Sequence, residues 1–263
     1  MRASAAGKPL LVLVAAVAIL LPALRLGGWA APNALLVAPG LLLLGLVGLG
    51  VARFQTGLFA RPVIAADPRR AGGRIALTFD DGPDPQSTRA VLDRLEGRGH
   101  RGTFFIIGER AERHPELVAE LALRGHGIGN HSFDHANATP FRTVGRLAGE
   151  LLRVNDLVER VAQIRPRWFR PPVGLLSPRV VAAAERARLE LVGWSVRARD
   201  GVAHPSVDAA VQRLSRGLRP GAIVLLHDAP AQRAATVLAI LDRLFDELDA
   251  RGLRSVTLDD LLG

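Results

Sequence analysis

Acidic and basic side chains follow several apolar runs of this 263-residue chain. Asp80 and Asp81 come directly after the first predicted strand, and His131 and His135 come after the third. The other groups of this kind follow later predicted strands: Arg170, Asp200 and His227. In parallel α/β folds the C-terminal ends of the strands meet at one edge of the sheet. We therefore expect these side chains to form one site.

The two histidines predict a metal site. His131 and His135 are four residues apart, a spacing that places two imidazoles on one face of a helical turn. With a carboxylate from the same edge, they leave open positions for water and substrate, as a catalytic metal requires. Zn²⁺ fits this ligand set. Fe²⁺ fits it too, since the same triad serves iron oxygenases, although those usually fold as antiparallel double-sheet barrels and not as a βα repeat.

The remaining groups have an ordinary structural explanation beside the functional one. Asp80 and Asp81 point to opposite sides of an extended strand, but a bend at the strand end lets both reach one site. Their Asp-Asp-Gly-Pro context is also good turn chemistry. Arg170 precedes two prolines that stiffen its loop, and a rigid guanidinium would fix and ionise a nearby carboxylate. His227 and Asp228 form either a catalytic group or a helix cap.

Short apolar runs alternate with amphipathic segments after residue 73, which predicts an α/β fold with a parallel sheet, open or closed into a barrel. We expect about seven strands, at 75–79, 103–107, near 127–129, 167–169, 190–196, 222–226 and 255–258. Helical patterns fall between them, at 87–95, 115–123, 144–161, 178–187, 207–218 and 234–249. These elements define a catalytic domain over residues 74–263.

The N-terminal part is predicted to be a membrane anchor, residues 1–53. Its uncharged stretches are 9–24 and 26–52, and the second exceeds the ~20 residues that span a bilayer. This indicates one or two transmembrane helices, followed by a linker at 54–73 that is rich in proline and glycine. Basic residues flank both ends, with only Arg25 between the stretches. That distribution favours a hairpin with the catalytic domain on the cytoplasmic face of the cell membrane.

The charge does not indicate nucleic-acid binding. Residues 1–70 hold a net charge of +6 out of the total of +9, beside the apolar stretches, where basic residues flank a membrane. The chain has no cysteine, so disulfides, thiolate metal sites and a cysteine nucleophile are excluded.

The motifs, taken in order, resemble the NodB-homology polysaccharide deacetylases, carbohydrate esterase family 4, over residues 74–260. They are Thr-Phe-Asp-Asp-Gly-Pro, His-Ser-x-x-His, Arg-Pro-Pro-x-Gly, a Trp-to-Asp segment and Leu-x-His. The resemblance implies a distorted (β/α) barrel with fewer than eight strands. It also implies a hydrolase acting on the carbon–nitrogen bond of an acetamide.

The resemblance implies a role for each charged or histidine side chain of the first three motifs. Asp81, His131 and His135 would bind a divalent metal, usually Zn²⁺, with Co²⁺ as the second choice. Asp80 would be the general base for the metal-bound water, and Arg170 would hold Asp80 ionised.

The later motifs imply the acid and the acyl pocket. His227 would be the general acid for the leaving amine, and Asp200 would pair with it. The substrate-binding residues carried over from the family are Pro172, Val173, Trp194 and Leu225. Val173 stands where the family usually has an aromatic residue, and Gly201 follows Asp200 where it often has tryptophan. Fewer aromatic platforms favour a short or lipid-linked saccharide.

We therefore expect a metal-dependent de-N-acetylase of N-acetylated amino sugars, in a glycan or in a lipid-linked saccharide. The alternatives are a catalytically silent carbohydrate-binding module on the same fold, and a deformylase or deacylase of a polyprenyl-linked amino sugar. The expected partners are this saccharide and the membrane.

Overall fold

A curled parallel sheet positions the site. The computed structural model describes residues 7–26, 33–52, 57–201, 205–228 and 234–263. Seven strands follow the order β5-β4-β3-β2-β1-β7-β6, and β8 pairs with the start of β1. In sequence order the eight described strands are β1 (Arg74–Asp80), β2 (Gly102–Ile106), β3 (Gly127–Asn130), β4 (Trp168–Phe169), β5 (Glu190–Leu191), β6 (Val196–Arg197), β7 (Ile223–His227) and β8 (Arg254–Ser255). The predicted α/β class and parallel sheet are confirmed.

The predicted strand at 190–196 is two short strands at opposite edges of the sheet. β5 pairs with β4, and β6 pairs with β7. The residues between them cross from one edge to the other. Val192 donates its N–H to the carbonyl of Phe169 at 3.0 Å, and Ser195 donates to the carbonyl of Ile223 at 3.0 Å. The crossing segment joins the two edges of the sheet, although β5 and β6 do not pair with each other. The sheet is therefore curled like a barrel that is not closed by hydrogen bonds between strands.

The six predicted helices of the catalytic domain are present with small shifts at their ends. They are α4 (Ser87–Gly97), α6 (Pro115–Leu123), α7 (Val144–Ala162), α8 (Pro178–Arg186), α9 (Val207–Gly217) and α10 (Ala234–Ala250). Three short helices were not predicted: α3 (Pro68–Ala71), α5 (Gly108–Arg113) and α11 (Leu258–Leu262). Helices of four to six residues are too short for a helical period to show in the sequence.

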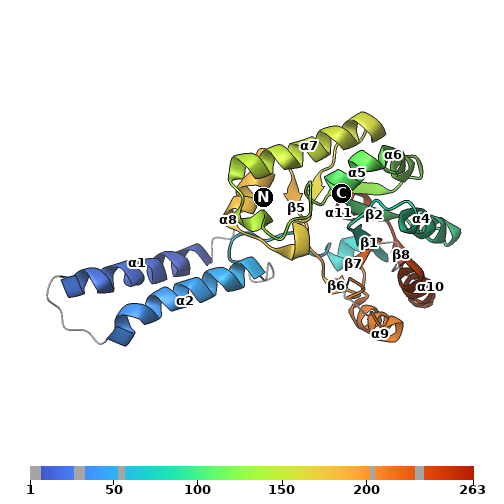
Figure 1. Cartoon of the computed structure of the whole chain (residues 1–263). Helices are drawn as coiled ribbons and strands as arrows, with labels where there is room; N and C mark the ends of the chain where they lie inside the picture. Colours follow the sequence, from blue (N-terminus) through green and yellow to red (C-terminus); the bar gives the residue numbers. More distant parts are fainter. Residues whose placement is uncertain (1–6, 27–32, 53–56, 202–204, 229–233) are drawn as a thin grey trace.

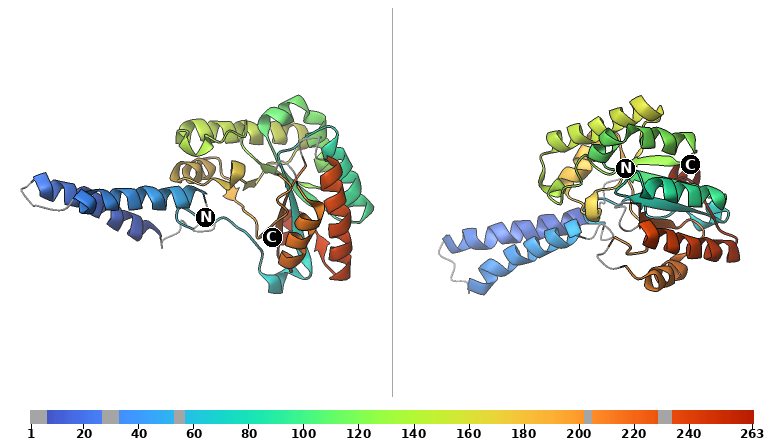
Figure 2. Two further views of the ribbon diagram at one scale, coloured as in Figure 1. Left: turned by 60° about the horizontal axis from the view of Figure 1, so that its bottom comes forward. Right: turned by 45° about the vertical axis from the view of Figure 1, so that its right-hand side comes forward.

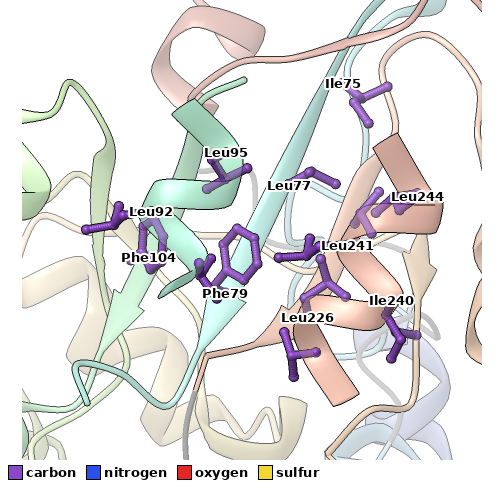
Figure 3. Close-up of a cluster of buried hydrophobic side chains, with 14 of the residues drawn as sticks. Ile75, Leu77, Phe79, Leu92, Leu95, Phe104, Leu226, Ile240, Leu241 and Leu244 are labelled. Atoms are coloured by element: carbon purple, nitrogen blue, oxygen red, sulfur yellow. The ribbon is translucent and has the colours of Figure 1, made fainter. Parts of the chain in front are cut away.

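The main core lies between the sheet and its covering helices. The rings of Phe79 and Phe104, on neighbouring strands, are stacked with their centroids 4.8 Å apart. Figure 3 shows the buried side chains of α4 and α10 around these rings, among them Leu92, Leu95, Ile240, Leu241 and Leu244. A second cluster joins α7 and α8 to Phe169 at the other edge. Burial on both sides explains why the strands are continuously apolar.

Two N-terminal helices, α1 (Gly7–Leu26) and α2 (Asn33–Ala52), pair as a hairpin that projects away from the α/β body (Figures 1 and 2). α1 contains the first uncharged stretch together with the flanking Lys8 and Arg25, and α2 lies within the second. Within the described part of the chain, no helix has both the length and the apolar character needed to cross a membrane. The prediction of transmembrane helices is therefore not supported there.

The segment expected as a linker lies against the sheet from residue 57 onwards; residues 54–56 fall outside the described part. Val63 donates to the carbonyl of Leu191 at 3.0 Å and accepts from Gly193 at 2.8 Å. Ala66 donates to the carbonyl of Gly221 at 2.8 Å. The bonds of Val63 cover the start of the crossing between β5 and β6, and the bond of Ala66 reaches the residues before β7, so this segment belongs to the structure that supports the site.

Helix α6 offers a matched test of the core. Leu121 is fully buried and Leu123 is 87% exposed on the same helix. We expect Leu121→Ala to lower the free energy of unfolding by about 2–5 kcal/mol, because the lost methyl groups leave a cavity. Leu123→Ala should change it by no more than about 0.5 kcal/mol. Urea denaturation of both variants measures the difference, and equal losses would contradict this packing.

Candidate active site

The polar residues predicted at the strand ends do meet at one edge of the sheet. Asp80 ends β1 beside His227, which ends β7. His131 follows β3, and Arg170 follows β4. A pocket of about 490 Å³ opens at this edge. Its lining residues are Asp80, Asp81, His131, His135, Val173, Gly174, Trp194, Arg197, Arg199, Gly201, Leu225 and His227.

Asp81, His131 and His135 form a group that suits a divalent cation. One ligand atom from each lies within 4.8 Å of the other two. Asp81 Oδ1 is 3.5 Å from His131 Nε2 and 3.2 Å from His135 Nε2. This oxygen is buried and accepts no hydrogen bond from the described residues. A buried carboxylate oxygen without a donor is costly unless a cation binds it, so the three side chains fit a metal.

The charge state of Asp81 agrees with this fit. Burial raises the pKa of the carboxyl, but the electrostatic attraction of His131 outweighs it and holds the pKa well below its usual range. Arg110 of α5 donates to the carbonyl of Asp81 at 2.8 Å and fixes the backbone there. Asp81 has φ 74°, a left-handed conformation that turns the chain sharply after Asp80. The turn lets both carboxylates reach the pocket.

The two histidines come together without the helical turn that their spacing predicts. No helix covers residues 131–135; Ser132 and His135 are left-handed, with φ 70° and 53°. Asn130 Oδ1 accepts from the N–H of Ser132 at 2.9 Å, and Ser132 Oγ accepts from the N–H of His135 at 3.1 Å. These local bonds replace helical ones, so the predicted conformation was wrong although the pairing was right.

His131 is oriented by a backbone carbonyl. Its Nδ1 lies 2.7 Å from the carbonyl oxygen of Arg170, in a buried setting. Nδ1 therefore carries a proton, and Nε2, which faces Asp81, is the atom that would bind a metal ion. Metal-binding histidines are commonly held in this way.

Asp80 is paired with a buried arginine. Arg170 is fully buried, and its Nη1 donates to Asp80 Oδ1 at 2.7 Å and to Thr78 Oγ1 at 2.9 Å. Its Nη2 donates to the carbonyl of Gly193 at 2.9 Å, and the guanidinium lies 4.2 Å from the centre of the Phe105 ring. The guanidinium can therefore bind one carboxylate oxygen while the other, Oδ2, stays available for proton transfer.

His227 forms the opposite side of the pocket and is paired with Asp200. Its Nδ1 is 2.9 Å from Asp200 Oδ1, and its backbone N–H donates to Asp200 Oδ2 at 2.8 Å. Burial lowers the pKa of His227, but the hydrogen bond and the charge of Asp200 raise it by more than burial lowers it. The charges of Asp80 and Asp81 add to this increase, and the resulting pKa is about 9. The imidazole is therefore protonated at neutral pH and can donate a proton from Nε2.

The predicted acyl-pocket residues divide into two groups. Val173, Trp194 and Leu225 line the pocket, whereas Pro172 is buried and does not. Val173 has φ 57°, a strained conformation for a β-branched residue, and its N–H donates no hydrogen bond within the described part of the chain. That amide is available to a substrate oxygen.

Gly201 is explained by the histidine beside it. A Cβ at this position would lie 2.9 Å from His227 Cε1. The glycine that reduces the aromatic surface therefore also makes room for the His227 ring.

Several supporting residues were not predicted. Thr78 lies on the same face of β1 as Asp80 and links Arg170 to the carbonyl of Val224, which accepts from Thr78 Oγ1 at 2.6 Å. A polar residue two positions before Asp80 in an otherwise apolar strand was the available signal. Asn130, which shapes the histidine loop, directly precedes His131.

Asp228 was considered with His227 as a possible helix cap, and the structure places its carboxyl against the first motif, beside Gly82 and Thr88. Burial raises its pKa to about 7, and Thr88 donates to its Oδ2 at 2.6 Å. A Cβ on Gly82 would lie 2.5 Å from this carboxyl, so only glycine fits after Asp81.

Comparisons with known proteins identify relatives of this chain. A sequence model of the family described as polysaccharide deacetylase matches residues 67–192, a range that ends before Asp200 and His227. A peptidoglycan-N-acetylglucosamine deacetylase of Bacillus cereus is 39% identical over 190 residues, 72% of this chain and 87% of that protein. A chitooligosaccharide deacetylase of Sinorhizobium fredii is 36% identical over 199 residues, 70% of this chain and 91% of that protein.

Solved structures show the same likeness. A peptidoglycan N-acetylglucosamine deacetylase superposes with a TM-score of 0.68 and 32% identity, covering 76% of this chain and 92% of that one. A family 4 carbohydrate esterase from Streptomyces lividans, in complex with acetate, superposes with a TM-score of 0.64 and 33% identity, covering 70% of this chain and 92% of that one.

The triad predicts metal binding that depends on His131. In chelator-stripped protein, we expect His131→Ala to weaken Zn²⁺ binding at least about 100-fold, since it removes a ligand and not just an outer partner. His114→Ala, at a partly exposed histidine outside the pocket, is the matched control and should bind as the parent does. Calorimetric titration of Zn²⁺ measures both, and equal affinity in the two variants would exclude this ligand set.

Proposed function

Because this chain belongs to the polysaccharide deacetylase family and is a hydrolase of carbon–nitrogen bonds other than peptide bonds, we propose that it removes the acetyl group from N-acetylated amino sugars with the help of a divalent metal ion. The motif resemblance is confirmed by these matches. The observation that carries the proposal is the pairing of Asp80 with Arg170 and of His227 with Asp200, on two sides of one metal-binding triad. N-acetylglucosamine residues of a glycan are the proposed substrate.

The metal would be held by Asp81, His131 and His135, and Zn²⁺ is the ion that this donor set suits best. When bound, such an ion polarises a carbonyl and lowers the pKa of water toward ~7. Both effects serve amide hydrolysis.

The side chains divide the proton transfers between them. Asp80 Oδ2 accepts a proton from the water that attacks the acetyl carbon, while Arg170 keeps Oδ1 bound. The free N–H of Val173 donates to the acetyl oxygen as negative charge develops on it. His227 Nε2 gives its proton to the sugar nitrogen as the carbon–nitrogen bond breaks. The products are acetate and the free amino sugar.

We also propose that residues 1–53 hold the catalytic domain at a cell membrane. The paired helices α1 and α2 expose large apolar side chains, among them Leu13, Ile19, Leu26, Leu41 and Leu44. The basic residues at both ends favour the cytoplasmic face, and a lipid-linked amino sugar would be accessible there. Alkaline phosphatase fused after Gly263 tests the side: activity of this reporter, which requires export, would contradict the cytoplasmic location.

Acetate release tests the function. The metal-loaded protein should release acetate from N-acetylglucosamine oligomers, and a chelator should abolish the release until Zn²⁺ or Co²⁺ is restored. The same assay with N-formyl and longer N-acyl sugars separates a deacetylase from a deformylase. Binding of the oligomer without acetate release, in protein shown to contain metal, would instead identify a silent binding module.

The pairing of His227 predicts the alkaline side of the pH profile. Activity should fall as His227 loses its proton, at or below pH about 9, because a bound cation offsets part of the effect of Asp80 and Asp81. Asp200→Asn removes the main stabilising charge and should shift this limb to lower pH. Asp246→Asn, at an exposed carboxylate on α10, should leave it in place. A profile of kcat/KM that does not move in Asp200→Asn would contradict the pair.

A further inference from the structure

One wall of the pocket carries two arginines that the reaction does not use. Arg197 and Arg199 line the same pocket as the triad and His227. Arg197 lies on β6 opposite Leu225 of β7, which also lines the pocket, so the register directs both side chains to the same space. Figure 1 shows β6 beside β7 at the edge of the sheet, next to α9.

Neither arginine has a carboxylate partner. Both side chains are exposed, and among the described residues neither forms an ion pair or a hydrogen bond. Residues outside the described part cannot supply a carboxylate side chain, because every Asp and Glu of the sequence lies within it. Arginines on the outer surface, by contrast, form ion pairs. Arg124, directly after α6, forms ion pairs with three carboxylates, those of Asp93, Glu96 and Glu120.

A third cation increases the local positive charge. Arg213 of α9 donates from Nε and Nη2 to the carbonyl of Ala198, at 3.1 and 2.8 Å, and so lies behind the peptide between the two arginines. Burial first, and then repulsion from Arg199 and Arg213, lowers the pKa of Arg197. Three like charges held together without a counter-ion destabilise the free protein, and such local conflict is typical of a binding site.

The other charges of the pocket are already balanced. Asp80 is paired with Arg170, and His227 is paired with Asp200. Asp81 faces the two histidines of the triad, where a cation fits. Among the described lining residues, only Arg197 and Arg199 have charges without a partner, so an additional bound group there should be negative.

We propose that Arg197 and Arg199 bind an anionic group, a carboxylate or a phosphate, carried by the saccharide beside the N-acetylated sugar that is hydrolysed. The inference rests on the proposed deacetylase function and specifies its substrate as an acidic one. Guanidinium groups suit this task, because their planar donors match both anions in pairs. The wall has little stacking surface to offer a neutral sugar, since Trp194 is the one Phe, Trp or Tyr residue among the described lining residues.

The anion has two chemical sources, and one set of substrates distinguishes them. A carboxylate would belong to a neighbouring acidic sugar in a polymer. A phosphate would link the amino sugar to a lipid or nucleotide carrier. Three probes are compared by acetate release with the full-length, Zn²⁺-loaded protein: a neutral N-acetylglucosamine tetramer, a tetramer that alternates N-acetylglucosamine with a carboxylate-bearing amino sugar, and an N-acetylglucosamine 1-diphosphate ester.

The measured quantity is the ratio of kcat/KM for the better anionic probe to kcat/KM for the neutral tetramer. We expect the parent to prefer an anionic probe, and the Arg197→Gln/Arg199→Gln variant to lower the ratio at least about tenfold, mainly through KM. Arg216→Gln/Arg219→Gln is the matched control. It removes the same charge from exposed positions outside the pocket and should keep the parent ratio.

Each outcome decides between the proposals. The anionic probe with the higher kcat/KM identifies the source of the anion. A parent that prefers the neutral tetramer, or a ratio that is equal in the two double variants, overturns the anion site, while acetate release from the tetramer keeps the proposed function. No acetate from any probe, in protein shown to contain metal, would contradict the deacetylase function and this inference together.

Discussion

The site depends on one buried cation, the guanidinium of Arg170. Removing a charge from water costs several kcal/mol unless it is paired and hydrogen-bonded. Arg170 meets that requirement through Asp80, Thr78 and the carbonyl of Gly193, while its own carbonyl accepts from His131. One residue therefore connects the proposed base, a proposed metal ligand, the first strand and the segment that crosses between the sheet edges. Any displacement of these elements would leave a buried charge without its partner.

This arrangement explains why the sheet is distorted. Gly193 lies between β5 and β6, where the chain crosses from one edge to the other, and the segment containing Val63 covers this crossing. A continuous ladder would pair the carbonyl of Gly193 with a neighbouring strand, whereas here it accepts from Arg170. The gap in the barrel thus supplies a hydrogen-bond acceptor to the site. The same crossing leads into β6, which places Arg197 in the pocket wall.

The sequence predicts residue identities better than conformations. Asp80, Asp81, His131, His135, Arg170, Asp200 and His227 were all predicted from their positions after apolar strands, because strand ends converge in any parallel sheet. The helical turn at 131–135 was wrong, since side chains of Asn130 and Ser132 cap a left-handed loop there, and spacing alone does not show such bonds. Arg197 and Arg199 were not singled out. In an arginine-rich chain, only the structure shows which arginines have no acidic partner.

In the proposed reaction Asp80 and Asp81, adjacent in sequence, have separate tasks, one as a base held by Arg170 and one as a metal ligand. The most direct measurement compares Zn²⁺ affinity and acetate release in Asp80→Asn and Asp81→Asn. Asp80→Asn should bind Zn²⁺ within a few-fold of the parent, while its turnover falls by about 10²–10⁴-fold. Asp81→Asn should lose both. An equal loss of Zn²⁺ in the two variants would contradict the account, because the carboxylates would then share one role.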